Sequence, residues 1–197
     1  MKEQPDAELM LSFQRERNYA AFEKLFRRHK DALLAFLIQL TGGRAVAEDV
    51  SQQAWLKVIE AARLGKYSDR EGVAFRTWLC TLARNHFIDE YKRKFAASRT
   101  VPLAEFPDAV DTPWSASAPD PGELTDQGQF AAHIQRALRT LPFEQREVIV
   151  FWAAGMELEE IAAIVQAPRD TVLSRKKYAI AKLRALMQTL DPRRCPV

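Results

Sequence analysis

The most distinctive chemistry of this sequence lies in residues 169–177, where short polar side chains stand next to cations. Hydroxyl and carboxylate groups on short side chains can reach base edges in a DNA groove, and lysine and arginine contact phosphates. We therefore expect this segment to bind duplex DNA. The residues assigned to this contact are Arg169, Asp170, Thr171, Ser174, Arg175, Lys176 and Lys177.

These residues open the second of two helices that a tight break separates. Apolar residues at helical spacing predict a helix over 157–166 and a longer one over 169–189, with a break at Gln166-Ala167-Pro168. Two such helices have the proportions of a helix-turn-helix unit. The alternative is a plain helical hairpin whose charged face only contacts water. Two more helices should precede the unit, one over 127–140 and one that Leu141-Pro142 opens and Gly155 ends.

Four helices are predicted in the N-terminal half, over 6–17, 19–40, 45–63 and 73–95. Asp6 is the expected N-cap of the first helix, because its carboxylate could accept hydrogen bonds from free backbone N–H groups. The second helix has a clear apolar stripe. The side chains expected to face inward on it are Phe22, Leu25, Phe26, His29, Leu33, Phe36, Leu37 and Leu40.

Residues 96–126 differ in composition from both halves and predict a linker. They hold five of the ten prolines, and residues 100–126 carry six acids and no Lys or Arg. The net charge is therefore −6 over 100–126, against +5 over 1–99 and +4 over 127–197. The fold expected is all-α, with two small helical domains at 6–95 and 127–189 joined by a flexible acidic linker.

No residues suggest a catalytic site, a metal site or a cofactor. The two cysteines lack CxxC spacing, and Cys80 stands in an apolar run that is typical of a protein core. His29 and His86 lie on apolar helix faces, where a histidine is usually buried beside a partner. The N-terminus is polar, and no apolar run approaches ~18 residues. We expect a cytoplasmic protein that does not itself insert into a membrane.

Motifs in both halves resemble those of the extracytoplasmic-function sigma factors of bacteria. The C-terminal half has Leu141-Pro142 followed by Arg146, then Glu-Glu-Ile-Ala at 159–162 and Pro-x-x-Thr-Val-x-Ser-Arg at 168–175. The N-terminal half has FEKLFRRHKDALLAFL, AEDVSQQAWLKV and FRTWLCTLARNHFIDEYKRK in the order of that family. The resemblance covers about 10–95 and 127–188. It implies a subunit of RNA polymerase that recognises and opens promoters and is not an enzyme itself.

The segment AEDVSQQAWLKV is similar to the helix that docks on the clamp helices of the polymerase β′ subunit. Helical spacing places Val50, Ala54 and Val58 in the core and leaves another face free. The matched positions on that face are Asp49, Gln52, Gln53 and Leu56. The resemblance makes these four residues candidates for binding the RNA polymerase core. Without it, an ordinary surface with Leu56 packed inside would be the simpler interpretation.

The segment TLARNHFIDEYKRK is similar to the part that handles the single-stranded −10 element of the promoter. Asn85 matches an Asn that in some members of the family helps line a pocket for a base turned out of the strand, and the loop at about 64–73 should complete that pocket. Phe87 and Tyr91 could stack on bases or pack in the core. The cations expected on phosphates are Arg84, Lys92, Arg93 and Lys94. The resemblance assigns the −35 element, read as duplex DNA, to the helix over 169–189.

The resemblance also implies an anti-sigma factor that covers both domains and can hold the protein at the inner membrane. The linker would mimic nucleic acid inside the polymerase channel. Two other functions stay open. A stand-alone helix-turn-helix regulator that dimerises on DNA would leave the N-terminal motifs unexplained. A nuclease would need clustered carboxylates for a metal, and the sequence shows no such cluster.

Overall fold

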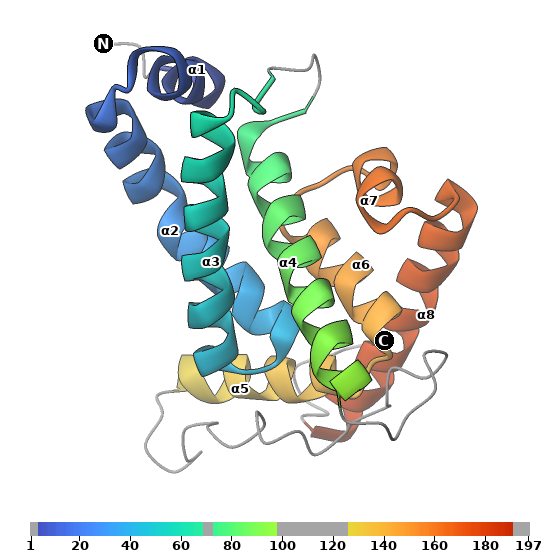
Figure 1. The fold of residues 1–197 in the computed structure, drawn as a ribbon. Helices are drawn as coiled ribbons and strands as arrows, with labels where there is room; N and C mark the ends of the chain where they lie inside the picture. Colours follow the sequence, from blue (N-terminus) through green and yellow to red (C-terminus); the bar gives the residue numbers. More distant parts are fainter. Residues whose placement is uncertain (1–3, 69–72, 98–125, 191–197) are drawn as a thin grey trace. The chain divides into compact units, whose positions relative to one another are not determined.

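The computed structural model describes residues 4–68, 73–97 and 126–190, which form helices and no strands (Figure 1). By their contacts these residues divide into two compact units, one from 4–37 and 47–97 and the other from 38–46 and 126–190. This confirms an all-α protein. The helices are α1 (Asp6–Glu16), α2 (Tyr19–Thr41), α3 (Arg44–Arg63), α4 (Phe75–Ala97), α5 (Asp126–Arg139), α6 (Phe143–Ala153), α7 (Leu158–Val165) and α8 (Arg169–Leu190).

The helices begin and end within two residues of the positions that apolar spacing predicts. Glycine accounts for two of these ends. Gly42 follows α2 with a φ of +77°, and Gly155 follows α6 with a φ of +82°. Glycine adopts this left-handed conformation without a steric cost. The linker expected over 96–126 lies almost wholly outside the described residues, since α4 ends at Ala97 and α5 begins at Asp126.

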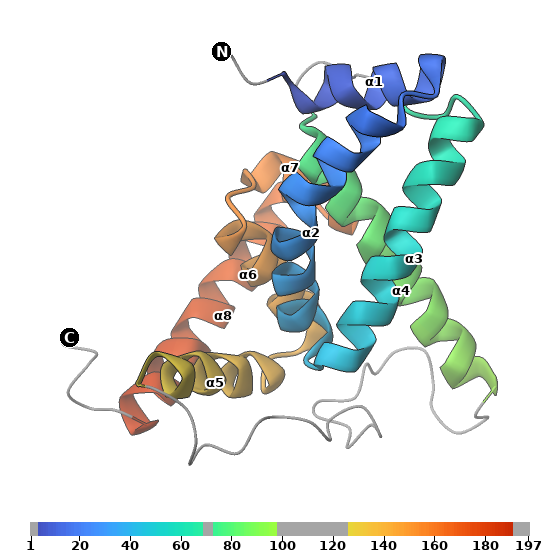
Figure 2. The same ribbon diagram turned by 90° about the vertical axis from the view of Figure 1, so that its left-hand side faces the viewer.

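In the first unit, α1 lies across one end of α2, α3 and α4 (Figures 1 and 2). The side chains that α1 buries are Leu9, Met10 and Phe13, each at most 1% exposed. Removing a side chain of this size from water contributes roughly 1.5–3 kcal/mol. Cys80 on α4 is 4% exposed, and burial raises the pKa of its thiol to about 12. It is therefore a neutral core residue, as expected.

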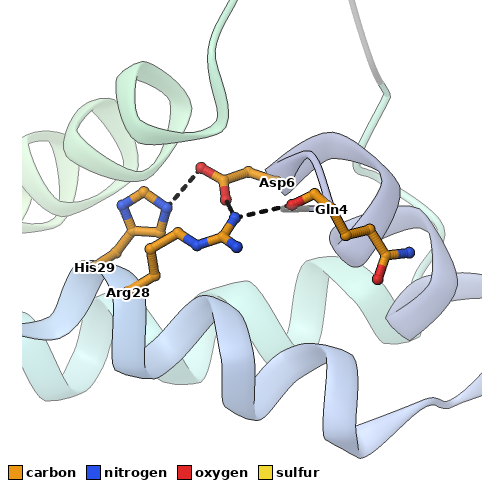
Figure 3. A network of polar contacts seen from close by, with 4 residues as sticks. All are labelled: Gln4, Asp6, Arg28 and His29. Atoms are coloured by element: carbon orange, nitrogen blue, oxygen red, sulfur yellow. Dashed lines mark hydrogen bonds and ion pairs between the residues drawn. The ribbon is translucent and has the colours of Figure 1, made fainter. Parts of the chain in front are cut away.

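Polar contacts also join α1 to α2 (Figure 3). The prediction that Asp6 is the N-cap of α1 is wrong, because Pro5 occupies that position. The Asp6 carboxylate turns to α2 instead, where it accepts a hydrogen bond from Arg28 and lies 2.7 Å from Nε2 of His29. Arg28 also donates to the carbonyl oxygen of Gln4 over 3.0 Å. His29 was expected to have a polar partner, and that partner is Asp6.

In the second unit, α8 contacts α5, α6 and α7. The core of this unit has a cluster of buried side chains, with further apolar residues packed against them. The buried members are Leu138, Leu141, Ile149 and Ala179, and the partly buried ones are Ile134, Ile180 and Leu183. The turn between α7 and α8 contains Gln166 at a φ of +55°. A non-glycine residue in this conformation is uncommon and costs about 1–2 kcal/mol.

Candidate functional surfaces

The outward face of α3 presents the four residues that the sequence singles out. Asp49, Gln52 and Gln53 are exposed, and Leu56 is 51% exposed. The opposite face of the helix is buried, with Val50, Ala54 and Val58 at most 4% exposed. The sequence therefore separates the two faces correctly. Leu56 is not packed inside, which removes the simpler interpretation of this residue.

A groove of about 480 Å³ runs between α2 and α3 beside this face. Leu56 and Gln52 line it together with Ile59, which is 38% exposed. Phe26 also lines the groove at 37% exposure, so the prediction that it faces the core is wrong. The complete lining is Phe22, Phe26, Lys30, Asp31, Leu34, Glu48, Ser51, Gln52, Trp55, Leu56 and Ile59.

Trp55 explains why Phe26 stays at the surface. Its side chain is 6% exposed and takes the interior position at the base of the groove, and the Phe26 ring packs against it in T-shaped geometry. The centroid of the Trp55 ring lies 5.9 Å from that of Phe22 and 5.1 Å from that of Phe26, and both pairs have T-shaped geometry. Aromatic pairs of this kind add ~0.5–1.5 kcal/mol beyond burial. The groove is thus an apolar surface with aromatic rings at its base and charged groups at Lys30, Asp31 and Glu48.

The next candidates lie on α4. Asn85 is exposed, and its Oδ1 accepts a hydrogen bond from Arg84 over 3.3 Å. Arg93 is exposed and forms an ion pair with Glu90 at 2.8 Å. Phe87 is 6% exposed and belongs to the core, which favours packing over base stacking. The side chains of Tyr91, Lys92 and Lys94 lie outside the described part of the chain.

His86 lies between these residues on α4 and is partly buried. Burial and the nearby Lys57 lower the pKa of its imidazole, although Glu90 and Asp89 act in the opposite direction. The ring is therefore neutral at pH 7. A neutral ring beside Asn85 adds no charge to attract phosphate.

Tyr67, near the start of the loop before α4, is held by contacts that the sequence analysis missed. The Gln14 side chain donates to the carbonyl oxygen of Tyr67 over 3.1 Å, and its Oε1 accepts from the N–H of Tyr67 over 3.0 Å. The Tyr67 ring is buried and lies 6.2 Å from the ring of Phe75 and 5.1 Å from that of Trp78. Residues 69–72 lie outside the described structure. Phe75 is the first residue of α4 after this loop, and Asn85 comes ten residues later. At 1.5 Å per residue, Asn85 therefore lies about 15 Å along the helix axis from the end of the loop.

On α8, the residues expected on DNA divide into two groups. Asp170, Ser174 and Lys177 are exposed on the side opposite Val172, which is fully buried. Thr171 lies at the edge of this face and is partly exposed. These residues form an outward face that can enter a groove of duplex DNA.

The second group consists of cations that have partners within their own unit. Arg169 forms an ion pair with Glu159 of α7, with Nε and Oε1 2.5 Å apart. The hydrogen bond from Arg169 lowers the pKa of the Glu159 carboxyl. The Lys176 ammonium lies 3.9 Å from the centroid of the Trp152 ring, in cation–π geometry.

Arg175 extends this second group. Its Nη2 lies 3.9 Å from a carboxylate oxygen of Glu144, at the limit of an ion pair, and its side chain is 25% exposed. These contacts link residues far apart in the sequence, so helical spacing alone could not reveal them. Phosphate contacts by Arg169, Arg175 or Lys176 would compete with contacts already present.

Other kinds of site are not found in the described residues. Within 4–68, 73–97 and 126–190, no group of three or more His, Cys, Asp or Glu residues could hold a metal ion. None of the helices in these ranges is both long and apolar enough to cross a membrane.

Comparison with known proteins shows which family the chain belongs to. Residues 25–95 match the family described as Sigma-70 region 2, and residues 137–185 match the family described as Sigma-70, region 4. The chain is 32% identical over 192 residues to the ECF RNA polymerase sigma factor SigM of Mycobacterium tuberculosis, which covers 96% of this chain and 88% of SigM. The chain is an extracytoplasmic-function (ECF) sigma factor.

Further relatives agree with this assignment. The RNA polymerase sigma factor CarQ of Myxococcus xanthus is 31% identical over 172 residues, which is 87% of this sigma factor and 91% of CarQ. The SigE of Mycolicibacterium smegmatis is 28% identical, and the match spans 57% of its length.

Among solved structures, a co-crystal of the sigma factor RpoE with the anti-sigma factor NepR from Bartonella quintana matches with a TM-score of 0.62. The match has 26% identity and covers 85% of this sigma factor and 96% of that chain. CnrH, in complex with the cytosolic domain of CnrY, shares the fold with a TM-score of 0.62, 22% identity and coverage of 94% and 99%.

The matched regions separate the candidate surfaces of this sigma factor. Region 2 contains most of α2 together with α3 and most of α4, so it includes Asn85 and all of the groove lining except Phe22. Region 4 runs from the end of α5 into α8, so it includes the helix-turn-helix. Sigma factors of this family bind core RNA polymerase and promoter DNA.

Proposed function

We propose that this ECF sigma factor docks on the β′ clamp helices of RNA polymerase through the outward face of α3. The observation that carries this proposal is Leu56, an apolar side chain 51% exposed between polar groups and beside an apolar groove. Such a mixture is typical of the centre of a protein interface. Asp49, Gln52 and Gln53 would supply the surrounding hydrogen bonds. The groove wall formed by Ile59 and Phe26 extends the apolar surface beyond the residues chosen from sequence.

Promoter opening is assigned to α4 and the loop before it. Asn85 is exposed and offers both donors and acceptors for the edge of a base. Turning a base out of the stack costs a few kcal/mol, so the pocket must recover that energy through binding. Arg84 and Arg93 would contact phosphates, as would Lys92 and Lys94. For Tyr91 both stacking on a base and packing in the core stay open, whereas the buried position of Phe87 favours a structural role.

Recognition of the −35 duplex is assigned to the outward face of α8. Asp170, Thr171 and Ser174 have the short side chains that read base edges, and Lys177 is exposed beside them. Arg175 is partly buried against the domain and would contact a phosphate by giving up its long contact with Glu144. Arg169 and Lys176 would act on DNA only by exchanging Glu159 and Trp152 for phosphates. They are therefore secondary contacts in this proposal.

Control by an anti-sigma factor is proposed from the match to the RpoE–NepR complex. An inhibitor that covers Leu56 and the outward face of α8 would bury surfaces that polymerase and DNA need. Free sigma factor would then rise only as the inhibitor is released or destroyed. An inhibitor anchored in the inner membrane would hold the protein at its cytoplasmic side. In this account binding energy alone drives promoter opening, without catalysis or a cofactor, and the acidic linker mimics nucleic acid in the polymerase channel.

Run-off transcription tests the function. Core RNA polymerase, genomic DNA fragments and the purified protein should give discrete transcripts that core polymerase alone does not produce. Aligned start sites should share two short motifs upstream. Transcripts identical with and without the protein would refute promoter recognition.

Inhibition needs a separate test. Proteins that copurify with the chain from its native host should include one that competes with core polymerase. A ternary complex of sigma factor, inhibitor and core would show that their surfaces do not overlap, and the occlusion mechanism would then be abandoned.

A further inference from the structure

The outward face of α8 has a large aromatic residue that the assignments above do not use. Tyr178 is 67% exposed. It follows Ser174 by four residues, so the two side chains are neighbours on one face of the helix. The opposite side of α8 is closed, because Val172 and Ala179 are both fully buried. Tyr178 therefore projects from the same side as the residues proposed to read DNA.

The surroundings of Tyr178 distinguish it from other exposed groups of this unit. Trp152 is 45% exposed, but the Lys176 ammonium covers its ring at 3.9 Å. Lys182, one turn beyond Tyr178, donates to the carbonyl oxygen of Thr140 over 2.7 Å and is held against the domain. Among the described residues Tyr178 has no such partner within the unit. Exposure of a single aromatic residue is ordinary, so its position beside Ser174 and Lys177 carries the argument.

We propose that Tyr178 contacts the promoter duplex in the major groove and sets the base preference about two base pairs from the position read by Ser174. This inference rests on the proposed role of α8 at the −35 element. Four residues of helix advance about 6 Å, and base pairs are stacked about 3.4 Å apart, so the two contacts lie about two base pairs apart.

The chemistry of the side chain indicates what it recognises. A tyrosine ring packs against apolar groups, and in the major groove the thymine methyl is the apolar group that a base presents. The phenol hydroxyl can also donate to a phosphate, which positions the ring without reading sequence. We therefore infer that Tyr178 favours a thymine at its position, through the ring and not through the hydroxyl.

The test uses holoenzyme assembled from core polymerase and the full chain. The probe is a promoter duplex library with a randomised −35 hexamer, from which bound members are selected and sequenced. Tyr178→Ala should abolish a thymine preference at one or two adjacent positions and lower affinity about tenfold, the usual cost of losing one base contact. Tyr178→Phe keeps the ring and should keep the preference. Ser174→Ala should alter a position about two base pairs away.

Tyr19→Ala is the matched control, since Tyr19 is 70% exposed but lies at the start of α2, in the first unit. It should leave the −35 preference unchanged. If Tyr178→Ala selects the same sequences as the wild type while Ser174→Ala does not, the inference fails and the role of α8 stands. If neither substitution alters any position, the proposed reading of DNA by α8 fails as well. A loss of preference in Tyr178→Phe equal to that in Tyr178→Ala would refute the contact through the ring.

Discussion

The exposed faces of α3 and α8 are built from different chemistry, although each belongs to a helix whose other side is buried. On α3 the exposed residues include Leu56 and Ile59, which line an apolar groove. On α8 the exposed residues include Ser174 and Lys177, beside further cations. Apolar groups with hydrogen-bonding neighbours suit a protein partner, whereas hydroxyls and cations suit nucleic acid. The composition of a face, and not its exposure, indicates the partner.

The cations of α8 refine this difference. Lys176 and Arg169 are basic in sequence but already contact Trp152 and Glu159 in the fold. A count of basic residues therefore overstates the number of phosphates that the helix can bind directly.

The largest effect is expected at the centre of the α3 face. Leu56→Asp should weaken binding to core polymerase by about 30-fold or more, because it places a charge in an apolar interface centre. The measurement is a titration of labelled chain with core polymerase. Leu64→Asp is the control, since Leu64 is 48% exposed but does not line the groove. Equal loss in the two variants would show that the groove has no special role.

A second effect is expected where Gln14 holds Tyr67. Gln14→Ala removes two hydrogen bonds and should destabilise the first domain by about 1–2 kcal/mol. Because the loop before α4 loses an anchor, promoter melting should fall roughly tenfold, a change of about 1.4 kcal/mol. Permanganate reactivity of −10 thymines in the holoenzyme complex measures melting. Arg15→Ala, at an exposed position of α1, should leave melting unchanged. Normal melting in Gln14→Ala would remove this loop from the account.

A smaller effect separates the cations of α8. Lys177→Ala should lower the salt dependence of −35 duplex binding by about 0.9 in the slope of log K against log salt concentration, the value of one phosphate contact. Lys176→Ala should change the slope less, because its ammonium contacts Trp152. Fluorescence anisotropy at several salt concentrations gives both slopes. A larger change for Lys176→Ala would mean that Trp152 does not hold it away from DNA.

The smallest effect concerns the turn that positions α8. Gln166→Gly should raise the free energy of unfolding of the second domain by about 0.5–1 kcal/mol. Glycine adopts the left-handed conformation without the steric cost that glutamine has there, although it loses more conformational entropy on folding. Thermal unfolding followed by circular dichroism measures this. Gln166→Ala should give no gain, since alanine keeps the steric cost. A destabilised Gln166→Gly would show that the glutamine side chain contributes more than the strain costs.

Much of the fold could be predicted from sequence because apolar spacing is a local signal. The helix predicted over 169–189 is observed over Arg169–Leu190, and the core of α3 is correct at Val50, Ala54 and Val58. The prediction for Phe26 is wrong because the larger Trp55 occupies the interior between the helices. Periodicity predicts which way a side chain points, but it does not show whether a larger side chain from another helix occupies the same part of the core.

The contacts that decide the candidate sites are long-range, and sequence could not give them. The local pattern predicted Asp6 as the N-cap of α1. In the fold its carboxylate contacts Arg28 and His29 of α2 instead, and these tertiary contacts could not be predicted from the local pattern. Gln14 and Tyr67 are 53 residues apart. Tyr178 could have been found from sequence, since it lies four residues after Ser174 on a predicted helix and residues at that spacing share one face.

The central claim is that region 2 holds the polymerase and region 4 reads the duplex. A competition measured by run-off transcription tests it most directly. Excess of a chain carrying Ser174→Ala and Lys177→Ala should occupy core polymerase and suppress transcription by the wild-type protein. The same chain with Leu56→Asp added should not suppress it. Equal suppression by both chains would contradict the account, because core binding would then not depend on the α3 face.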